Sequence, residues 1–233
     1  MTFIFWQNIN SMHQSAFLKA LAMHHDVTLI TMMKGTGRED MGWIEPELPR
    51  VNVLHIREID WRSLIRTNSG PNVFHVFAGL HAFRPVHRAM KYAMQFDCRI
   101  GVYAEPLVMK GIAGVIKQIR GYWDALTLAN RLDFVLCIGK ECRRQYISWG
   151  FPEQKLHDWA YVTELPDSPI VHDVNHRPFR IIFPASCSPR KGADLLLEAA
   201  VSLAEEVSFE LICYALPAHA VNAFERRMIS IIG

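Results

Sequence analysis

Two adjacent cations stand at a strand-to-helix junction near residue 190. The turn 188–194 (SPRKGAD) follows the apolar run FRIIF and precedes the helical run LLLEAA. Backbone N–H groups at a helix N-terminus attract anions, and basic side chains beside them would act on the same phosphate. Short basic pairs are also common in solvated turns, but this placement favours phosphate binding. We therefore expect Arg190, Lys191 and Gly192 to contact a phosphate group.

The turn after the first apolar run of the chain carries amide, hydroxyl and imidazole groups. Residues 7–14 (QNINSMHQ) connect that run to the first helical segment, with Ser11 in the N-cap position. A helix N-terminus suits anions or sugar hydroxyls, but the turn lacks the G-x-G-x-x-G pattern of dinucleotide sites. An ordinary capped loop is the alternative to a binding role for Asn10, Ser11, His13 and Gln14.

A carboxylate and an imidazole follow two other apolar runs. Pro106 ends the run 99–104 and restricts Glu105 to an extended conformation. A carboxylate at the end of a strand can bind sugar hydroxyls or act as a base, and a solvated turn glutamate is an equal alternative. His81 comes three residues after the run 72–78, where it would face the same edge of a sheet.

The longest helical segment, residues 109–130, is amphipathic. At about 100° per residue its charged residues fall on one arc, and apolar residues fill much of the rest. Such a helix can lie on an anionic membrane, which gives possible peripheral membrane contact. The more ordinary alternative is the solvated face of a packed helix. The charged arc consists of Lys110, Lys117, Arg120, Asp124 and Arg131.

Several kinds of site are not expected. The sequence contains neither H-E-x-x-H nor a similar metal-ligand pattern, and it lacks the G-x-S-x-G motif of esterases, so no metal and no cofactor are expected. The cysteines lack C-x-x-C spacing and mostly border apolar runs, which favours buried free thiols and a reducing compartment. They are Cys98, Cys137, Cys142, Cys187 and Cys213.

Composition limits the class of protein. Of the 233 residues, 50% are hydrophobic and 21% charged, as in globular proteins, and the net charge of +2 gives no support for nucleic-acid binding. The N-terminus (MTFIFWQNIN) lacks the features of a signal peptide, and no apolar run approaches the ~20 residues of a membrane span. We expect a cytoplasmic protein that is at most peripheral at the inner face of the membrane.

Short apolar runs alternate with helical periods over residues 1–163. This alternation predicts an α/β fold with a doubly wound parallel sheet, a Rossmann-like domain that binds ligands at the carboxyl ends of its strands. The predicted strands are 2–6, 26–31, 51–56, 72–78, 99–104 and 133–138, and the predicted helices are 13–24, 84–96, 109–130 and 140–149.

A second domain is predicted to begin after a linker. Residues 164–178 contain three prolines and interrupt the alternation of apolar runs and helical periods, which begins again in 179–233. The predicted strands there are 179–183 and 208–213, and the predicted helices are 191–205 and about 219–230. Two strands and two helices make an incomplete second Rossmann-like domain.

The segment 179–214 resembles the opening of the donor-binding domain of family 4 (group 1) glycosyltransferases, which have the GT-B fold. That family has a strand, a Gly-Arg turn and then x-x-K-G-x-x-x-L-L-x-A. The N-terminal part is also similar to bacterial members, through FWQNINSMHQSAFLKALA, YAEP and FVLCIGKECRRQYISWGFPEQKLHDWAYV. The matching residues of the motif are Lys191, Gly192, Leu195, Leu196, Glu198 and Ala199.

The resemblance implies a nucleotide-diphosphate sugar as donor and a glycan or lipid-linked acceptor, in bacterial surface polysaccharide or glycolipid assembly and with retention of configuration. Donor-diphosphate contacts would come from Ser186, Arg190, Lys191 and Gly192, although Ala185-Ser186 replaces the family's Gly-Arg turn. Glu105 stands where relatives place a catalytic or acceptor-contacting histidine. The acceptor side would comprise Asn10, Ser11, His13, Gln14 and His81.

The family also uses a downstream segment with paired glutamates, and the sequence ends before it. We therefore expect the 233-residue chain to transfer sugar weakly or not at all, and to self-associate through the incomplete second domain. Two alternatives stay open. One is a non-catalytic Rossmann module that binds a glycan or a partner protein, and the other is a different α/β enzyme such as a sugar-nucleotide epimerase.

Overall fold

The computed structural model describes residues 1–35, 44–165, 179–186, 191–203 and 206–214. The chain divides into two compact units, Met1–Leu165 and Pro166–Gly233. Of the predicted linker, Glu164 and Leu165 belong to the first unit, where Glu164 forms an ion pair with Lys19 and accepts a hydrogen bond from Ser15. The rest of the linker and the predicted helix 219–230 lie outside the described residues.

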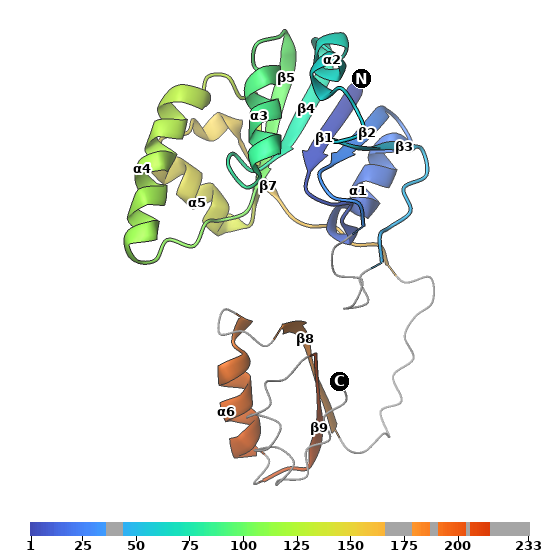
Figure 1. The fold of residues 1–233 in the computed structure, drawn as a ribbon. Helices are drawn as coiled ribbons and strands as arrows, with labels where there is room; N and C mark the ends of the chain where they lie inside the picture. Colours follow the sequence, from blue (N-terminus) through green and yellow to red (C-terminus); the bar gives the residue numbers. More distant parts are fainter. Residues whose placement is uncertain (36–43, 166–178, 187–190, 204–205, 215–233) are drawn as a thin grey trace. The chain divides into compact units, whose positions relative to one another are not determined.

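The first unit is a seven-stranded sheet in which every pair of neighbours is parallel (Figure 1). The strand order is β3-β2-β1-β4-β5-β6-β7. The strands are β1 (Thr2–Gln7), β2 (Asp26–Thr31), β3 (Val51–His55), β4 (Gly70–Ala78), β5 (Cys98–Ala104), β6 (Phe134–Ile138) and β7 (Leu156–Trp159). The helices are α1 (Met12–Ala22), α2 (Trp61–Thr67), α3 (Arg84–Ala93), α4 (Gly111–Leu128), α5 (Lys140–Trp149) and the 3₁₀ turn η2 (Glu153–Lys155).

Helices cover both faces of this sheet, because alternate residues of each strand point to opposite sides. In β1, Phe5 packs in the cluster that contains Leu18 of α1, while Ile4 and Trp6 pack in a larger cluster on the other face. That larger cluster takes side chains from α2, α3 and α5. The predicted doubly wound, Rossmann-like architecture is therefore confirmed.

Two elements of the first unit, α2 and β7, were not predicted because their own sequences carry too weak a pattern. The seven-residue helix α2 is too short to show a period; its start is fixed by Asp60, whose carboxylate accepts hydrogen bonds from the backbone N–H groups of Arg62 and Ser63. Strand β7 (LHDW) lies at the edge of the sheet and buries fully only Leu156, so it has no apolar run. The predicted helix 140–149 is correct to the residue, because Gly150 ends it with φ of 95°.

The described part of the second unit is a parallel pair of strands with one helix. These are β8 (Phe179–Ser186), β9 (Phe209–Tyr214) and α6 (Ala193–Leu203). Ala200, Phe209 and Leu211 form its small core. Phe179, Ile182 and Leu195 are each at least 65% exposed. Such apolar exposure is the basis of the predicted self-association, which stays a prediction.

Strand β4 carries a fully buried histidine. His75 accepts a hydrogen bond from Trp6 Nε1 at its Nδ1 (3.1 Å), and its Nε2 donates to the carbonyl oxygen of Asn68 (2.9 Å). Both ring nitrogens are thus satisfied by a neutral imidazole, and burial lowers the pKa of His75. This histidine is a core residue, as expected for one inside an apolar strand.

The buried imidazole makes stability depend on pH. Below a pH of about 6.5 the unfolded chain binds a proton at residue 75 that the folded chain does not, so the free energy of unfolding should fall by up to ~1.4 kcal/mol per pH unit. Urea unfolding followed by tryptophan fluorescence checks this. In the variant His75→Gln, the free energy of unfolding should fall less steeply as the pH is lowered below about 6.5. In His157→Gln, which changes an exposed histidine, the fall should be as steep as in the wild type. A full slope in His75→Gln would contradict the assignment.

Candidate functional site

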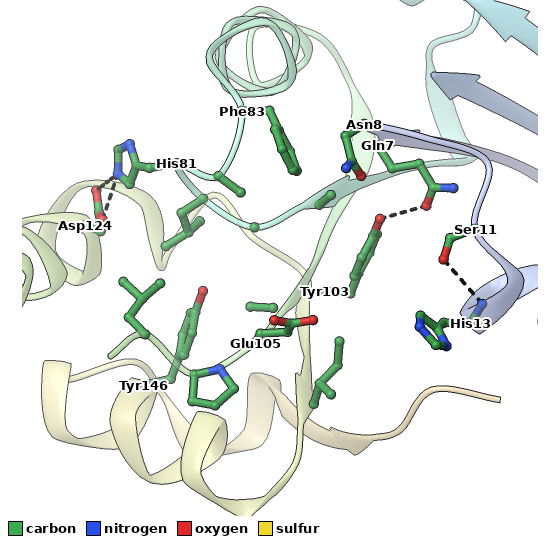
Figure 2. Close-up of a pocket in the computed structure, with 18 of the residues that line it drawn as sticks. Gln7, Asn8, Ser11, His13, His81, Phe83, Tyr103, Glu105, Asp124 and Tyr146 are labelled. Atoms are coloured by element: carbon green, nitrogen blue, oxygen red, sulfur yellow. Dashed lines mark hydrogen bonds and ion pairs between the residues drawn. The ribbon is translucent and has the colours of Figure 1, made fainter. Parts of the chain in front are cut away.

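A cavity of about 670 Å³ lies at the carboxyl edge of the seven-stranded sheet. The chain segments that follow β1, β4 and β5 form much of its wall, and helices α4 and α5 contribute the rest. Figure 2 shows polar side chains from these segments pointing toward a common space. Of the residues predicted on the acceptor side, Ser11, His13, Gln14 and His81 line this cavity, and so does Glu105, the predicted catalytic residue.

The turn after β1 provides donors and acceptors at one end of the cavity. Ser11 caps α1 by accepting a hydrogen bond from the His13 N–H (3.3 Å), as the sequence predicted. Gln14 is buried and lines the cavity, and its Oε1 has no hydrogen-bond partner among the described residues. A buried carbonyl oxygen without a partner costs free energy, so a ligand hydroxyl that donates to it would be bound favourably.

Asn10 does not line the cavity. Its Nδ2 donates to the carbonyl oxygen of Pro46 (2.8 Å), and the side chain is buried beneath the turn. The contact fixes the segment around Pro46 against the turn after β1. The Oδ1 of the same amide is buried and has no hydrogen-bond partner among the described residues, so the predicted contact between Asn10 and a ligand stays a prediction.

A tyrosine of β5 joins the floor of the cavity to β1. The hydroxyl of Tyr103 donates to Gln7 Oε1 (2.7 Å), and both side chains are buried. Burial raises the pKa of Tyr103, so the phenol stays protonated and remains a donor. With its Oε1 engaged by Tyr103, Gln7 uses its Nε2 to donate a hydrogen bond to the carbonyl oxygen of Ile9 (2.7 Å). This second hydrogen bond fixes the start of the turn.

Glu105 is the only carboxylate on the described wall of the cavity that is exposed to solvent. The hydroxyl of Tyr161 donates a hydrogen bond to its Oε1. Burial and the neighbouring Glu105 raise the pKa of Tyr161, which keeps this donor protonated. Tyr161 in turn packs against the ring of His13, with centroids 5.1 Å apart. Glu105 is thereby held in place with its second oxygen still able to accept.

An imidazole and a carboxylate are hydrogen-bonded on the opposite wall. His81 Nε2 lies 2.8 Å from both carboxylate oxygens of Asp124, which is 7% exposed and belongs to α4 (Figure 2). The ring of His81 also packs against His87, whose centroid is 4.5 Å away. His87 contacts the Leu80 carbonyl through Nδ1 (2.6 Å), and burial lowers the pKa of His87. Asp124 therefore fixes the ring orientation of His81.

Four residues that line the cavity were assigned no specific role from the sequence. Asp124 was assigned to a solvated charged arc, although a single acid among cations was a signal that it had a specific partner. Gln7, Tyr103 and Tyr161 gave little local signal, because their roles depend on contacts between distant segments. The Tyr161–Glu105 contact, for example, joins residues 56 positions apart.

The residues predicted to bind the donor diphosphate are only partly described. Lys191 is exposed and lies two residues before the first residue of α6, and Gly192 between them has φ of 76°, which favours glycine. Arg190 and the side chain of Ser186 lie outside the described residues. Lys191 and Gly192 thus lie just before the N-terminus of α6, and the predicted contact with a phosphate group stays a prediction.

Three further observations concern metals, thiols and membranes. Over the described ranges, no group of three His, Cys, Asp or Glu side chains is arranged to hold a metal ion. Cys98, Cys137 and Cys142 are free thiols, and burial raises the pKa of Cys98 to about 11. Within the part of the chain that the structure describes, no helix is both long and apolar enough to cross a bilayer.

The fold matches solved structures of GT-B proteins. No protein-family model and no curated protein sequence matches this chain. The lipopolysaccharide outer core galactosyltransferase WaaB, in its apo form, is 9% identical with a TM-score of 0.60 over 99% of this chain and 67% of WaaB. The Anabaena protein Alr3699/HepE, in complex with UDP-glucose, is 10% identical with a TM-score of 0.58 over 100% of this chain and 69% of its own.

These likenesses confirm the predicted fold class, an α/β Rossmann-like domain within a partial GT-B fold. At such low identity they establish the architecture alone.

The contact between Tyr161 and Glu105 can be tested without a ligand. The variant Glu105→Gln removes the carboxylate that helps to raise the pKa of Tyr161, so that pKa should fall and only burial should hold it above its ordinary value. NMR titration of ring-labelled tyrosine checks this, with Tyr161→Phe to assign the signal. An unchanged pKa of Tyr161 in Glu105→Gln would show that the two groups do not interact.

Proposed function

We propose that this chain forms part of a nucleotide-sugar glycosyltransferase, with the acceptor bound in the cavity of the first unit. The observation that carries the proposal is the cavity itself. It combines a fixed carboxylate, a buried unpartnered amide oxygen and an oriented imidazole on walls that also include Leu80, Phe83 and Trp149. Aromatic and apolar walls with a few placed polar groups are what a sugar ring and its hydroxyls require.

Glu105 is proposed as the residue that receives the acceptor hydroxyl. The hydroxyl would donate to the carboxylate oxygen that Tyr161 leaves available. In the transfer step the hydroxyl oxygen forms a bond to the anomeric carbon of the donor, and the bond from that carbon to the diphosphate oxygen breaks. The nucleoside diphosphate leaves with the electron pair, and the hydroxyl proton passes to Glu105. The imidazole of His81, oriented by Asp124, contacts a second hydroxyl.

Lys191 is proposed to act on the diphosphate of the donor. Its position before α6 supports this, because its ammonium group and the N–H groups of the first turn of that helix would stabilise the negative charge on the leaving group. Arg190 and Ser186 belong to the same proposal. The protein named WaaB acts on lipopolysaccharide outer core, which supports surface polysaccharide or glycolipid assembly as the context for this chain in a bacterial cytoplasm.

Ligand titration tests the two halves of the proposal separately. Calorimetry with neutral oligosaccharides should give binding that Glu105→Gln weakens about tenfold, the value of one charge-assisted hydrogen bond. Titration with UDP, GDP and their sugars should give binding that Glu105→Gln leaves unchanged and Lys191→Ala weakens. The matched control is Glu153→Gln, an exposed carboxylate outside the cavity.

The pattern of results separates the alternatives. Oligosaccharide binding without any nucleotide binding would indicate a non-catalytic glycan-binding module. Nucleotide-sugar binding with epimerised donor as product would indicate an epimerase. If neither ligand class binds, or if Glu153→Gln weakens oligosaccharide binding as much as Glu105→Gln does, the proposal is wrong.

A further inference from the structure

Helix α4 turns its apolar face toward solvent. Six large apolar side chains on it are 59% to 82% exposed, namely Ile112, Val115, Ile116, Ile119, Trp123 and Leu126. At about 100° per residue they fall within an arc of roughly 100°. A helix that packs on a sheet normally buries such an arc. The ordinary alternative, a packed helix with its charged arc toward solvent, does not account for this exposed apolar arc.

Specific contacts hold the helix in this orientation. Its buried residues are Gly114, Gly121, Asp124 and Leu128, on the side opposite to the apolar arc. A Cβ atom at Gly121 would lie 2.3 Å from the ring of Trp149, so only glycine permits this close approach to α5. On the same side Asp124 binds His81, and Gln118 accepts a hydrogen bond from Trp149 Nε1 (3.1 Å). The apolar arc cannot turn inward without breaking these contacts.

The charge around the apolar arc is positive. Between residues 107 and 128 the only acid is Asp124, which is buried against His81. The bases are Lys110 and Arg120, both exposed, and Lys117, which is half-buried. Leu107 and Val108, just before the helix, are exposed as well. Large apolar residues with a tryptophan on one face and cations beside them characterise helices that lie in the interface of an anionic bilayer.

We propose that α4 docks this protein on an anionic lipid bilayer, with the apolar arc inserted among the acyl chains and Lys110 and Arg120 on the headgroups. A second copy of the chain fits the surface less well, because packing two such faces together would bring like charges close. In Figure 1, the ribbon of α4 lies at the outer margin of the first unit.

The docked bilayer would lie beside the acceptor cavity. Lys117, Gly121 and Asp124 of α4 line that cavity from the side of the helix away from the apolar arc, and Arg120, at the border between the two sides, lines it as well. The assignment of the acceptor class, unlike the docking itself, rests on the proposed transferase function. With that function, the acceptor is a glycan attached to a membrane lipid. Its lipid would stay in the bilayer while its sugar enters the cavity.

Vesicle binding tests the docking without any donor or acceptor. The full chain should sediment with phosphatidylcholine vesicles that contain phosphatidylglycerol, and binding should weaken in high salt. The variant Ile119→Gln/Trp123→Gln should reduce the partition coefficient at least about tenfold. Met23→Gln is the matched control, since Met23 is 64% exposed, as Ile119 is, and lies outside this surface. Circular dichroism checks that all variants are folded.

Quenching by brominated lipid identifies the inserted side chain. Wild-type fluorescence should be quenched by vesicles of brominated phosphatidylglycerol, and Trp123→Phe should lose most of that quenching while still binding. Equal sedimentation of Ile119→Gln/Trp123→Gln and wild type would overturn the proposal. So would equal binding to pure phosphatidylcholine, or a wild-type dimer that the double variant converts to monomer. Failure of sugar binding would leave the vesicle result intact, so the two proposals fail separately.

Discussion

The site depends on one constraint, the parallel pairing of β1 with both β2 and β4. The chain leaves β1 toward α1, whose Leu18 packs on one face of the sheet. It leaves β4 toward α3, whose Val86 and Met90 pack on the other face. Segments that leave adjacent strands in opposite directions create a crevice at the carboxyl edge. Glu105, His81 and Gln14 can meet there although they are far apart in the sequence.

The fold was largely predictable because its signals are local. Apolar runs such as 26–31 are buried on both faces of a parallel sheet, so their hydrophobicity alone marks them as strands. Gly150 and Ser11 gave the end of α5 and the start of α1 from their own backbone and capping chemistry. Strand β7 was not predicted, because it is an edge strand with one buried residue and therefore has no apolar run.

The site was only partly predictable because it depends on contacts between segments. Strand ends and caps pointed to Glu105, His81 and the turn after β1, since the carboxyl edge follows from the fold class. The same reasoning could not find Tyr161 or Asp124, whose partners are 56 and 43 positions away. It also could not find the contact of the Asn10 amide with the Pro46 carbonyl oxygen, which joins residues 36 positions apart.

Helix α4 connects the two proposals. Its small and acidic residues face the protein, where Gly121 admits Trp149 and Asp124 orients His81, and its large apolar residues face outward. Because the usual arrangement is inverted, the large apolar side chains of α4 are exposed to water, and insertion into a bilayer would bury them. The same helix would thus bring the cavity wall to the membrane surface.

Diffraction from crystals soaked with the tightest-binding oligosaccharide would show directly where the acceptor binds. We expect a sugar ring in the cavity of the first unit, with hydroxyls that donate to Glu105 and to Gln14 Oε1. A sugar bound elsewhere on the chain, with Glu105 still in contact only with Tyr161, would contradict this expectation.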